Sequence, residues 1–242
     1  MTKRIPVYLA AASLIFLFSC NLSSKKSTTG DGDDDGFVSL FDGKSTDGWR
    51  GYQKDHVPAK WLVEDGTLHF DPDAEGDGGD IMIDRKYANF HLKLEWKIEE
   101  AGNSGILYLG SEDTIFHAIY YTAPEMQVLD NARHPDAKLG TNGNRQAGSL
   151  YDLIPADPQN FKGAGEWNQA EIIVKDKHVQ HIQNGVVVVE YDYGTQMWDA
   201  LVARSKFPEL NPDWAKLQDE GYIDLQDHGN NVWYRNIKIK EL

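Results

Sequence analysis

The chain has 242 residues, 40% of them hydrophobic, so it can bury a sizeable core as one large domain or two small ones. Its formal net charge of -14 argues against a nucleic-acid partner, because binding phosphates requires a basic surface that displaces their counterions. The only cysteine, Cys20, excludes an intramolecular disulfide framework and a cysteine-based zinc site.

The N-terminal residues have the pattern of an export signal. Lys3 and Arg4 precede an apolar run over residues 5–18, which is shorter than the roughly 20 residues that span a bilayer. A small residue followed by Cys20 resembles the box of bacterial lipoproteins, although Phe18 is bulkier than that pattern usually takes. Residues 1–20 are therefore predicted to be a lipoprotein signal peptide, and lipid on Cys20 would anchor the exported protein to a membrane. An ordinary signal peptide with an incidental cysteine is the alternative.

Residues 21–36 are predicted to be a flexible tether, because they are rich in Gly, Ser and Asp and lack apolar spacing. A calcium site is an alternative interpretation of the four aspartates in this segment, Asp31, Asp33, Asp34 and Asp35. Such an acidic run is more often a solvated spacer.

From Phe37 onward the dominant period of the sequence is two, which is typical of half-buried strands. Residues 61–70 read as a hairpin turning at Asp65-Gly66, and residues 89–98 read as one long alternating strand. A second hairpin turns at Asn184-Gly185. The other predicted strands are residues 105–109, 125–129, 170–175, 179–183, 186–191, 222–226 and 233–239.

About a dozen short strands with turn residues between them predict an all-β domain over residues 37–242, an antiparallel sandwich or jelly roll. A short helical excursion interrupts it near residues 196–218, where Pro212 follows Asn211 and predicts a helix over residues 213–218. Residues 198–205 are a second helical candidate.

Candidate chemistry lies where strands end in polar residues. Alternation places Met126 and Val128 on the core face of their strand and Glu125 and Gln127 on the other face. Asp130 ends this strand and His134 follows in the loop, so a carboxylate and an imidazole able to move protons or bind a metal lie close together. A polar strand rim is the alternative interpretation.

Further candidates have the same two interpretations. Gln226 and His228 leave a strand end beside Gly229, and Asn103 opens a strand. His181 precedes a hairpin turn, and Trp167 offers an aromatic plane for a sugar or for the core. The sequence contains no nucleophile elbow, phosphate loop, dinucleotide fingerprint or paired-histidine zinc helix.

Several of these segments together resemble the 3-keto-disaccharide hydrolase domain family. The similar stretches, in order, are residues 37–44, 48–49, 63–66, 103–106, 125–131, 134–137, 165–168, 181 with 184–185, 205–207, and 221–229 leading into 232–237. The resemblance implies a concanavalin-like or laminin-G-like β-sandwich that cleaves glycosides carrying a ketone at C3. Many members carry an arginine where this chain has Tyr108-Leu109-Gly110, so a substrate contact here differs or comes from elsewhere.

The implied reaction removes the proton at C2, forms an enediolate and expels the substituent at C1, with or without rehydration. Glu125, His134 and His228 are then the catalytic candidates. The substrate-binding candidates are Asn103, Gln127, Asp130, Trp167, His181 and Gln226. A divalent metal ion held by Glu125 and His134 would stabilise the enediolate. A non-catalytic carbohydrate-binding lipoprotein is the main alternative function, and a structural or adhesive surface protein is a weaker one.

Overall fold

The computed structural model describes residues 1–2 and 36–242, and the compact unit runs from Asp35 to Leu242. The predicted signal peptide and tether, including Cys20, lie outside the described residues apart from Met1, Thr2 and Gly36. Within the described residues, no helix is long and apolar enough to cross a membrane.

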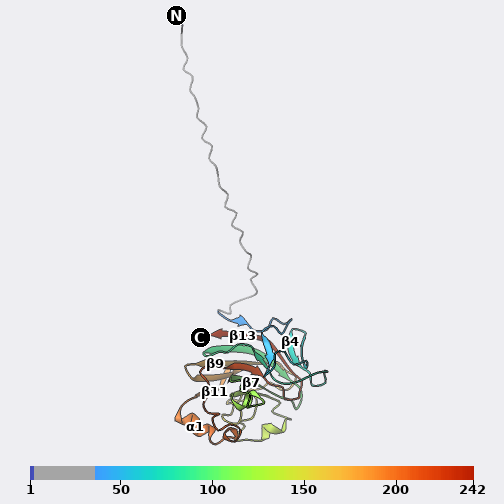
Figure 1. Ribbon diagram of the computed structural model, residues 1–242, viewed down its shortest axis with the longest axis vertical. Coiled ribbons are helices and arrows are strands. Elements are labelled where there is room, and N and C mark those ends of the chain that lie inside the picture. Colours follow the sequence, from blue (N-terminus) through green and yellow to red (C-terminus); the bar gives the residue numbers. More distant parts are fainter. Residues whose placement is uncertain (3–35) are drawn as a thin grey trace. The chain divides into compact units, whose positions relative to one another are not determined.

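The domain is a sandwich of two antiparallel sheets, which confirms the predicted fold class. The large sheet has the order β11-β10-β9-β6-β13-β4-β3, and β1 pairs with β13. Its strands are β1 (Val38–Ser39), β3 (Trp61–Glu64), β4 (Thr67–Phe70), β6 (Phe90–Ile98), β9 (Asn168–Lys175), β10 (His178–Gln183), β11 (Val186–Asp192) and β13 (Val232–Glu241). Figure 1 shows β9, β11 and β13 running across the domain, with α1 (Gln196–Val202) near its lower edge.

The small sheet has the order β2-β5-β12-β7-β8. Its strands are β2 (Trp49–Gly51), β5 (Ile81–Ile83), β7 (Asn103–Gly110), β8 (Glu125–Leu129) and β12 (Tyr222–Leu225). Neighbouring strands pair antiparallel, so residues opposite each other project from the same face.

Alternating side chains of both sheets build the core. In β6, Phe90, Leu92, Leu94, Trp96 and Ile98 are all buried, as their spacing predicts. The two predicted hairpin turns are confirmed, since Asp65, Gly66, Asn184 and Gly185 all have positive φ, the conformation that type I′ turns require.

The helical excursion differs in detail from its prediction. Helix α1 begins at Gln196 because the Thr195 hydroxyl accepts a hydrogen bond from the Trp198 amide at 3.2 Å. The predicted helix over residues 213–218 is wrong: residues 212–215 form a turn, residues 216–218 are irregular, and a short helix, α2 (Phe207–Leu210), precedes them. The buried Trp214 stacks on Phe207 with ring centroids 3.9 Å apart, so a tertiary contact holds the chain in a turn there.

Candidate active site

A cavity of about 360 Å³ lies over the face of the small sheet that points away from the core. Its polar lining comes from β7, β8 and the chain segments next to β5 and β12, namely Asp80, Asn103, Glu125, Gln127, Gln226, Asp227 and His228. The opposite wall comes from connecting segments, namely Ala118, Tyr120, Tyr151, Lys206, Phe207 and Leu210. A polar floor facing a partly aromatic wall suits a sugar, which has hydroxyl groups and apolar C–H faces.

Strand register explains the polar floor. Leu107 pairs with Glu125 and Gly105 pairs with Gln127 between β7 and β8. Met126 and Val128 face the hydrophobic core, so alternation turns Glu125 and Gln127 to the opposite face, as the sequence predicts, and there they line the cavity.

Gly105 makes room for Glu125. A Cβ atom at position 105 would lie 2.4 Å from Glu125 Oε1, which is closer than van der Waals contact allows. The carboxyl group of Glu125 therefore leans over the backbone of β7, toward the middle of the floor.

Glu125 is a buried carboxyl group, with 7% of its surface exposed. Burial raises its pKa to about 8, because a low-dielectric environment disfavours the charged form; Lys206 opposes this shift, and Asp80 and Asp136 add to it. A carboxyl that titrates near neutral pH is suited to proton transfer.

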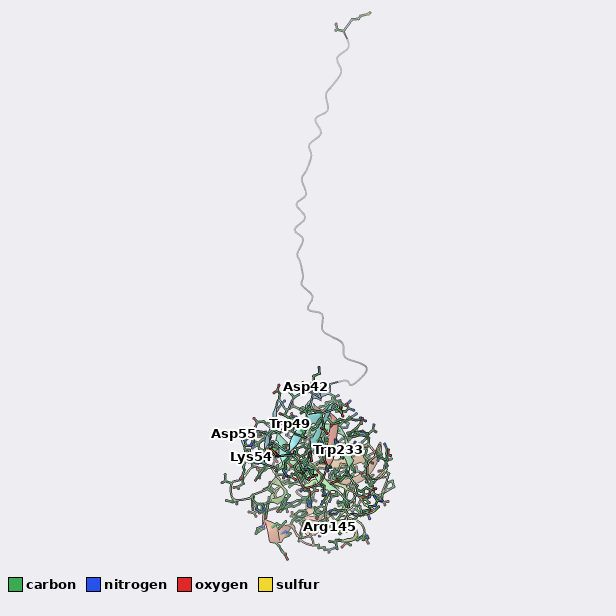
Figure 2. All side chains as sticks on the ribbon, turned by 90° about the vertical axis from the view of Figure 1, so that its right-hand side faces the viewer. Asp42, Trp49, Lys54, Asp55, Arg145 and Trp233 are labelled. Carbon is green, nitrogen blue, oxygen red and sulfur yellow. The ribbon has the colours of Figure 1, made fainter. Side chains whose placement is uncertain are left out.

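Lys206 and Tyr151 form a hydrogen-bonded pair on the cavity wall. Lys206 Nζ donates to the Tyr151 hydroxyl at 3.1 Å, and that hydroxyl donates to Asp136 Oδ2 at 2.8 Å. Arg145 holds Asp136 in turn, with Nη1 2.8 Å from Asp136 Oδ1. Figure 2 places Arg145 at the end of the domain opposite Asp42. Partial desolvation lowers the pKa of Lys206, while the charge of Glu125 raises it.

Two further carboxyl groups accompany Glu125. Asp80 lines the cavity, and Asp224 of β12 is fully buried with neither carboxylate oxygen bonded to any described residue. Desolvation raises the pKa of both groups above the usual range of aspartate.

The predicted polar residues divide into two groups. Asn103, Gln127, Gln226 and His228 line the cavity together with Glu125. His134 lies just outside the lining, with its ring centroid 6.3 Å from that of His228. Burial lowers the pKa of His134, the charge of His228 adds to this shift, and His134 Nδ1 accepts a hydrogen bond from the Asp136 amide at 3.2 Å.

Besides His134, three predicted residues lie outside the cavity lining: Asp130, His181 and Trp167. Asp130 caps the turn after β8, accepting hydrogen bonds from the amides of Ala101 at 2.8 Å and Ala132 at 3.0 Å. His181 is fully buried in the core, where its Nε2 lies 2.7 Å from the Tyr108 hydroxyl. These contacts give both side chains a structural role.

Trp167 lies beside the large sheet instead. The guanidinium of Arg235 sits 3.9 Å from its ring centroid, and Lys97 also approaches the ring. Lys97 and Arg235 alternate with buried residues of β6 and β13, so this cluster is on the outer face of the large sheet.

Sequence reasoning missed Asp80, Tyr151, Lys206 and Asp224 as members of or neighbours to the site. Lys206 carried a signal only as part of the 205–207 stretch that resembles the family. Asp224 had a signal in its own strand, because it shares a face with Gln226.

The proposed metal candidates do not form a ligand set. Within residues 1–2 and 36–242, no group of three or more His, Cys, Asp or Glu side chains is arranged to hold a metal ion. Glu125 lines the cavity while His134 lies outside its lining, so no chemical step is assigned to a metal bound by this pair.

Comparison with known proteins gives concordant results. A 3-keto-disaccharide hydrolase of Bacteroides thetaiotaomicron is 48% identical over 231 residues, which cover 87% of this chain and 80% of the relative. A crystal structure from Parabacteroides distasonis, provisionally named a glycosyl hydrolase, is 30% identical with a TM-score of 0.77 and covers 86% of this chain and 94% of its own.

A Bacillus subtilis protein with a galectin-like fold is 12% identical with a TM-score of 0.52, covering 80% of this chain and 89% of its own, and this likeness shows the fold alone. The model of the 3-keto-alpha-glucoside-1,2-lyase-like domain matches residues 36–240, nearly the whole described domain. The chain is an enzyme, and it belongs to the 3-keto-alpha-glucoside-1,2-lyase-like domain family.

Proposed function

We propose that the protein cleaves 3-keto glycosides at the bond to C1 of the oxidised sugar. The observation that carries the proposal is the buried carboxyl group of Glu125, which faces a sugar-sized cavity together with the ammonium of Lys206. The family and the 48% identical 3-keto-disaccharide hydrolase support this substrate class.

The chemistry of the substrate gives the cavity residues their tasks. A ketone at C3 acidifies the hydrogen at C2, so Glu125 in its ionised form removes it as a general base. Negative charge then develops on the enediolate oxygens, where the ammonium of Lys206, positioned by its hydrogen bond to the Tyr151 hydroxyl, stabilises it as a hydrogen-bond donor. The enediolate expels the C1 substituent.

The polar floor and rim complete the site. Asn103, Gln127 and Gln226 orient the sugar hydroxyls with their amide groups. His228, with His134 beside it, acts at the rim in proton transfer to or from water. The names of the family and of the relative describe an elimination and a hydrolysis, and one enediolate accounts for both, because they differ only in whether water adds to the eliminated product.

The test is the release of a chromogenic leaving group from a 3-keto glucoside by the purified protein, with the unoxidised glucoside as control. We expect release from the 3-keto compound only. Release that stops after chelation would show that a metal takes part. No release, combined with retention on immobilised glycan, would overturn the proposal in favour of a carbohydrate-binding module.

We further propose that the protein is an exported lipoprotein held on a membrane by lipid on Cys20, on the evidence of residues 1–20. Cys20→Ser should prevent labelling with radioactive palmitate and move the protein from the membrane fraction to the soluble fraction. Unchanged fractionation of this variant would contradict the anchor.

A further inference from the structure

The reaction proposed above needs a proton for the oxygen that leaves C1, because a sugar alkoxide is a poor leaving group. We propose that Asp80 donates this proton from the side of the cavity opposite Glu125. The assignment rests on the proposed function and adds the acid that complements its base.

Strand order places the two carboxyl groups on either side of the floor. Asp80 immediately precedes β5, while the carboxyl of Glu125 leans over Gly105 of β7. Strand β12 lies between β5 and β7, so two strand spacings, roughly 10 Å, separate the two positions. A sugar ring fits between side chains that converge across this gap.

The carboxyl group of Asp80 is held in place through one of its two oxygens. Its Oδ1 accepts a hydrogen bond from the Asp227 amide at 2.9 Å, and its backbone carbonyl accepts one from the Tyr52 amide at 3.1 Å. No hydrogen bond from a described residue engages Oδ2, although Asp80 lines the cavity. Oδ2 is therefore the atom that can carry a proton and present it to a ligand.

The surroundings of Asp80 favour its protonated form. Burial raises the pKa of Asp80, the Asp227 amide opposes this shift through its hydrogen bond, and the charge of Asp227 adds to it. The nearby cation Lys54 forms an ion pair with Asp77. Besides Asp80 and Asp227, the titratable groups lining the cavity are Tyr120, Glu125, Tyr151, Lys206 and His228.

A neighbouring carboxyl group, Asp224, also favours its protonated form. It pairs in register with Met82, two residues beyond Asp80, and is therefore a diagonal neighbour of Asp80 on adjacent strands. A fully buried carboxylate without a hydrogen-bond partner is strongly unfavourable, so Asp224 stays neutral. Desolvation and the charges of Asp80 and Glu125 raise its pKa.

The rim histidines are the competing donors. Burial lowers the pKa of His134, which disfavours the imidazolium form that would donate a proton. His228 follows Asp227 in the chain and lines the same cavity, so the experiment includes it as a variant.

The test uses two substrates that differ only in leaving group: a 3-keto disaccharide, whose sugar leaving group needs a proton, and a 3-keto nitrophenyl glucoside, whose phenolate does not. Asp80→Asn should lower kcat for the disaccharide by at least about 100-fold and for the nitrophenyl glucoside by less than about 5-fold. When both substrates carry deuterium at C2, the variant should still exchange it for hydrogen from water, because Glu125 is intact. Asp73→Asn, the same change at an exposed position between β4 and β5, is the matched control.

A measurement on the unmodified enzyme covers the case in which the variant does not fold. Cleavage of the disaccharide should fall at high pH, where Asp80 loses its proton, and cleavage of the nitrophenyl glucoside should not show that fall.

Several results would overturn the assignment. Equal losses with both substrates, or no loss, would remove Asp80 as the acid. A selective loss in His228→Ala or Glu125→Gln would give the role to that residue instead. If the unmodified enzyme cleaves neither substrate, the proposed function fails before the acid is tested, so the two failures are distinguishable.

Discussion

Glu125→Gln should make the enzyme less active and more stable at the same time. The change removes the ionisable group but keeps the side-chain shape beneath the cavity. As the proposed base, Glu125 should contribute at least about 100-fold to kcat. The gain in stability follows from the cost of keeping this carboxyl group in a buried place.

The magnitude of that cost follows from linkage. The folded protein raises the pKa of Glu125 from 4.5 to about 8. As pH rises from about 4.5 to 8, the unfolded chain releases this proton while the folded protein keeps it, so folded stability falls by about 1.4 kcal/mol per pH unit. The loss is under about 1 kcal/mol at pH 5 and about 3 kcal/mol at pH 7.

The assay is thermal unfolding of both proteins at pH 5 and pH 7. A change of about 3 kcal/mol corresponds to a rise in Tm of about 6 to 12 °C for a domain of this size. Any fixed effect of the amide is the same at both pH values and cancels in the comparison. An identical difference in Tm at pH 5 and pH 7 would refute the buried, proton-binding state of Glu125, and unchanged kcat would refute its role as the base.

Three other variants test neighbouring contacts. Gly105→Ala should reduce kcat by at least about 10-fold without unfolding the protein, since its methyl group takes the place of Glu125 Oε1; wild-type kinetics would contradict the packing described. Lys206→Met should reduce kcat by about 100-fold and move the acidic limb of the pH profile to higher pH, because Lys206 lowers the pKa of Glu125, whereas Lys206→Arg should restore part of the rate; an unshifted limb would exclude their coupling. Asp224→Asn should stabilise the protein increasingly as pH rises above about 4, measured by urea unfolding, and a pH-independent difference would show that Asp224 is ionised when folded.

Strand periodicity predicted the part of the site that lies within strands. Alternation in residues 125–129 places Glu125 and Gln127 opposite the core, and the fold confirms this arrangement. The same alternation predicted the sandwich, because a sheet whose strands are apolar on one face must bury that face against another layer.

The remaining part of the site depends on contacts between distant segments. Lys206 and Tyr151 meet across 55 positions of the chain, and no local pattern encodes that pairing. Asp80 and Asp224 become neighbours only when β5 pairs with β12. The helix predicted over residues 213–218 is wrong for the same reason, because the burial of Trp214 and its stacking on Phe207 override the local preference.

The most direct test of the account follows the hydrogen at C2. A 3-keto glycoside carrying deuterium at C2 is incubated with the enzyme in ordinary water, and the sugar product is analysed by mass spectrometry beside an enzyme-free sample of the substrate. We expect the product to lose its deuterium during cleavage, the enzyme-free substrate to keep it, and Glu125→Gln to suppress both the loss and the cleavage. Cleavage to a product that retains deuterium at C2 would contradict the account, because the bond at C1 would then break without an enediolate.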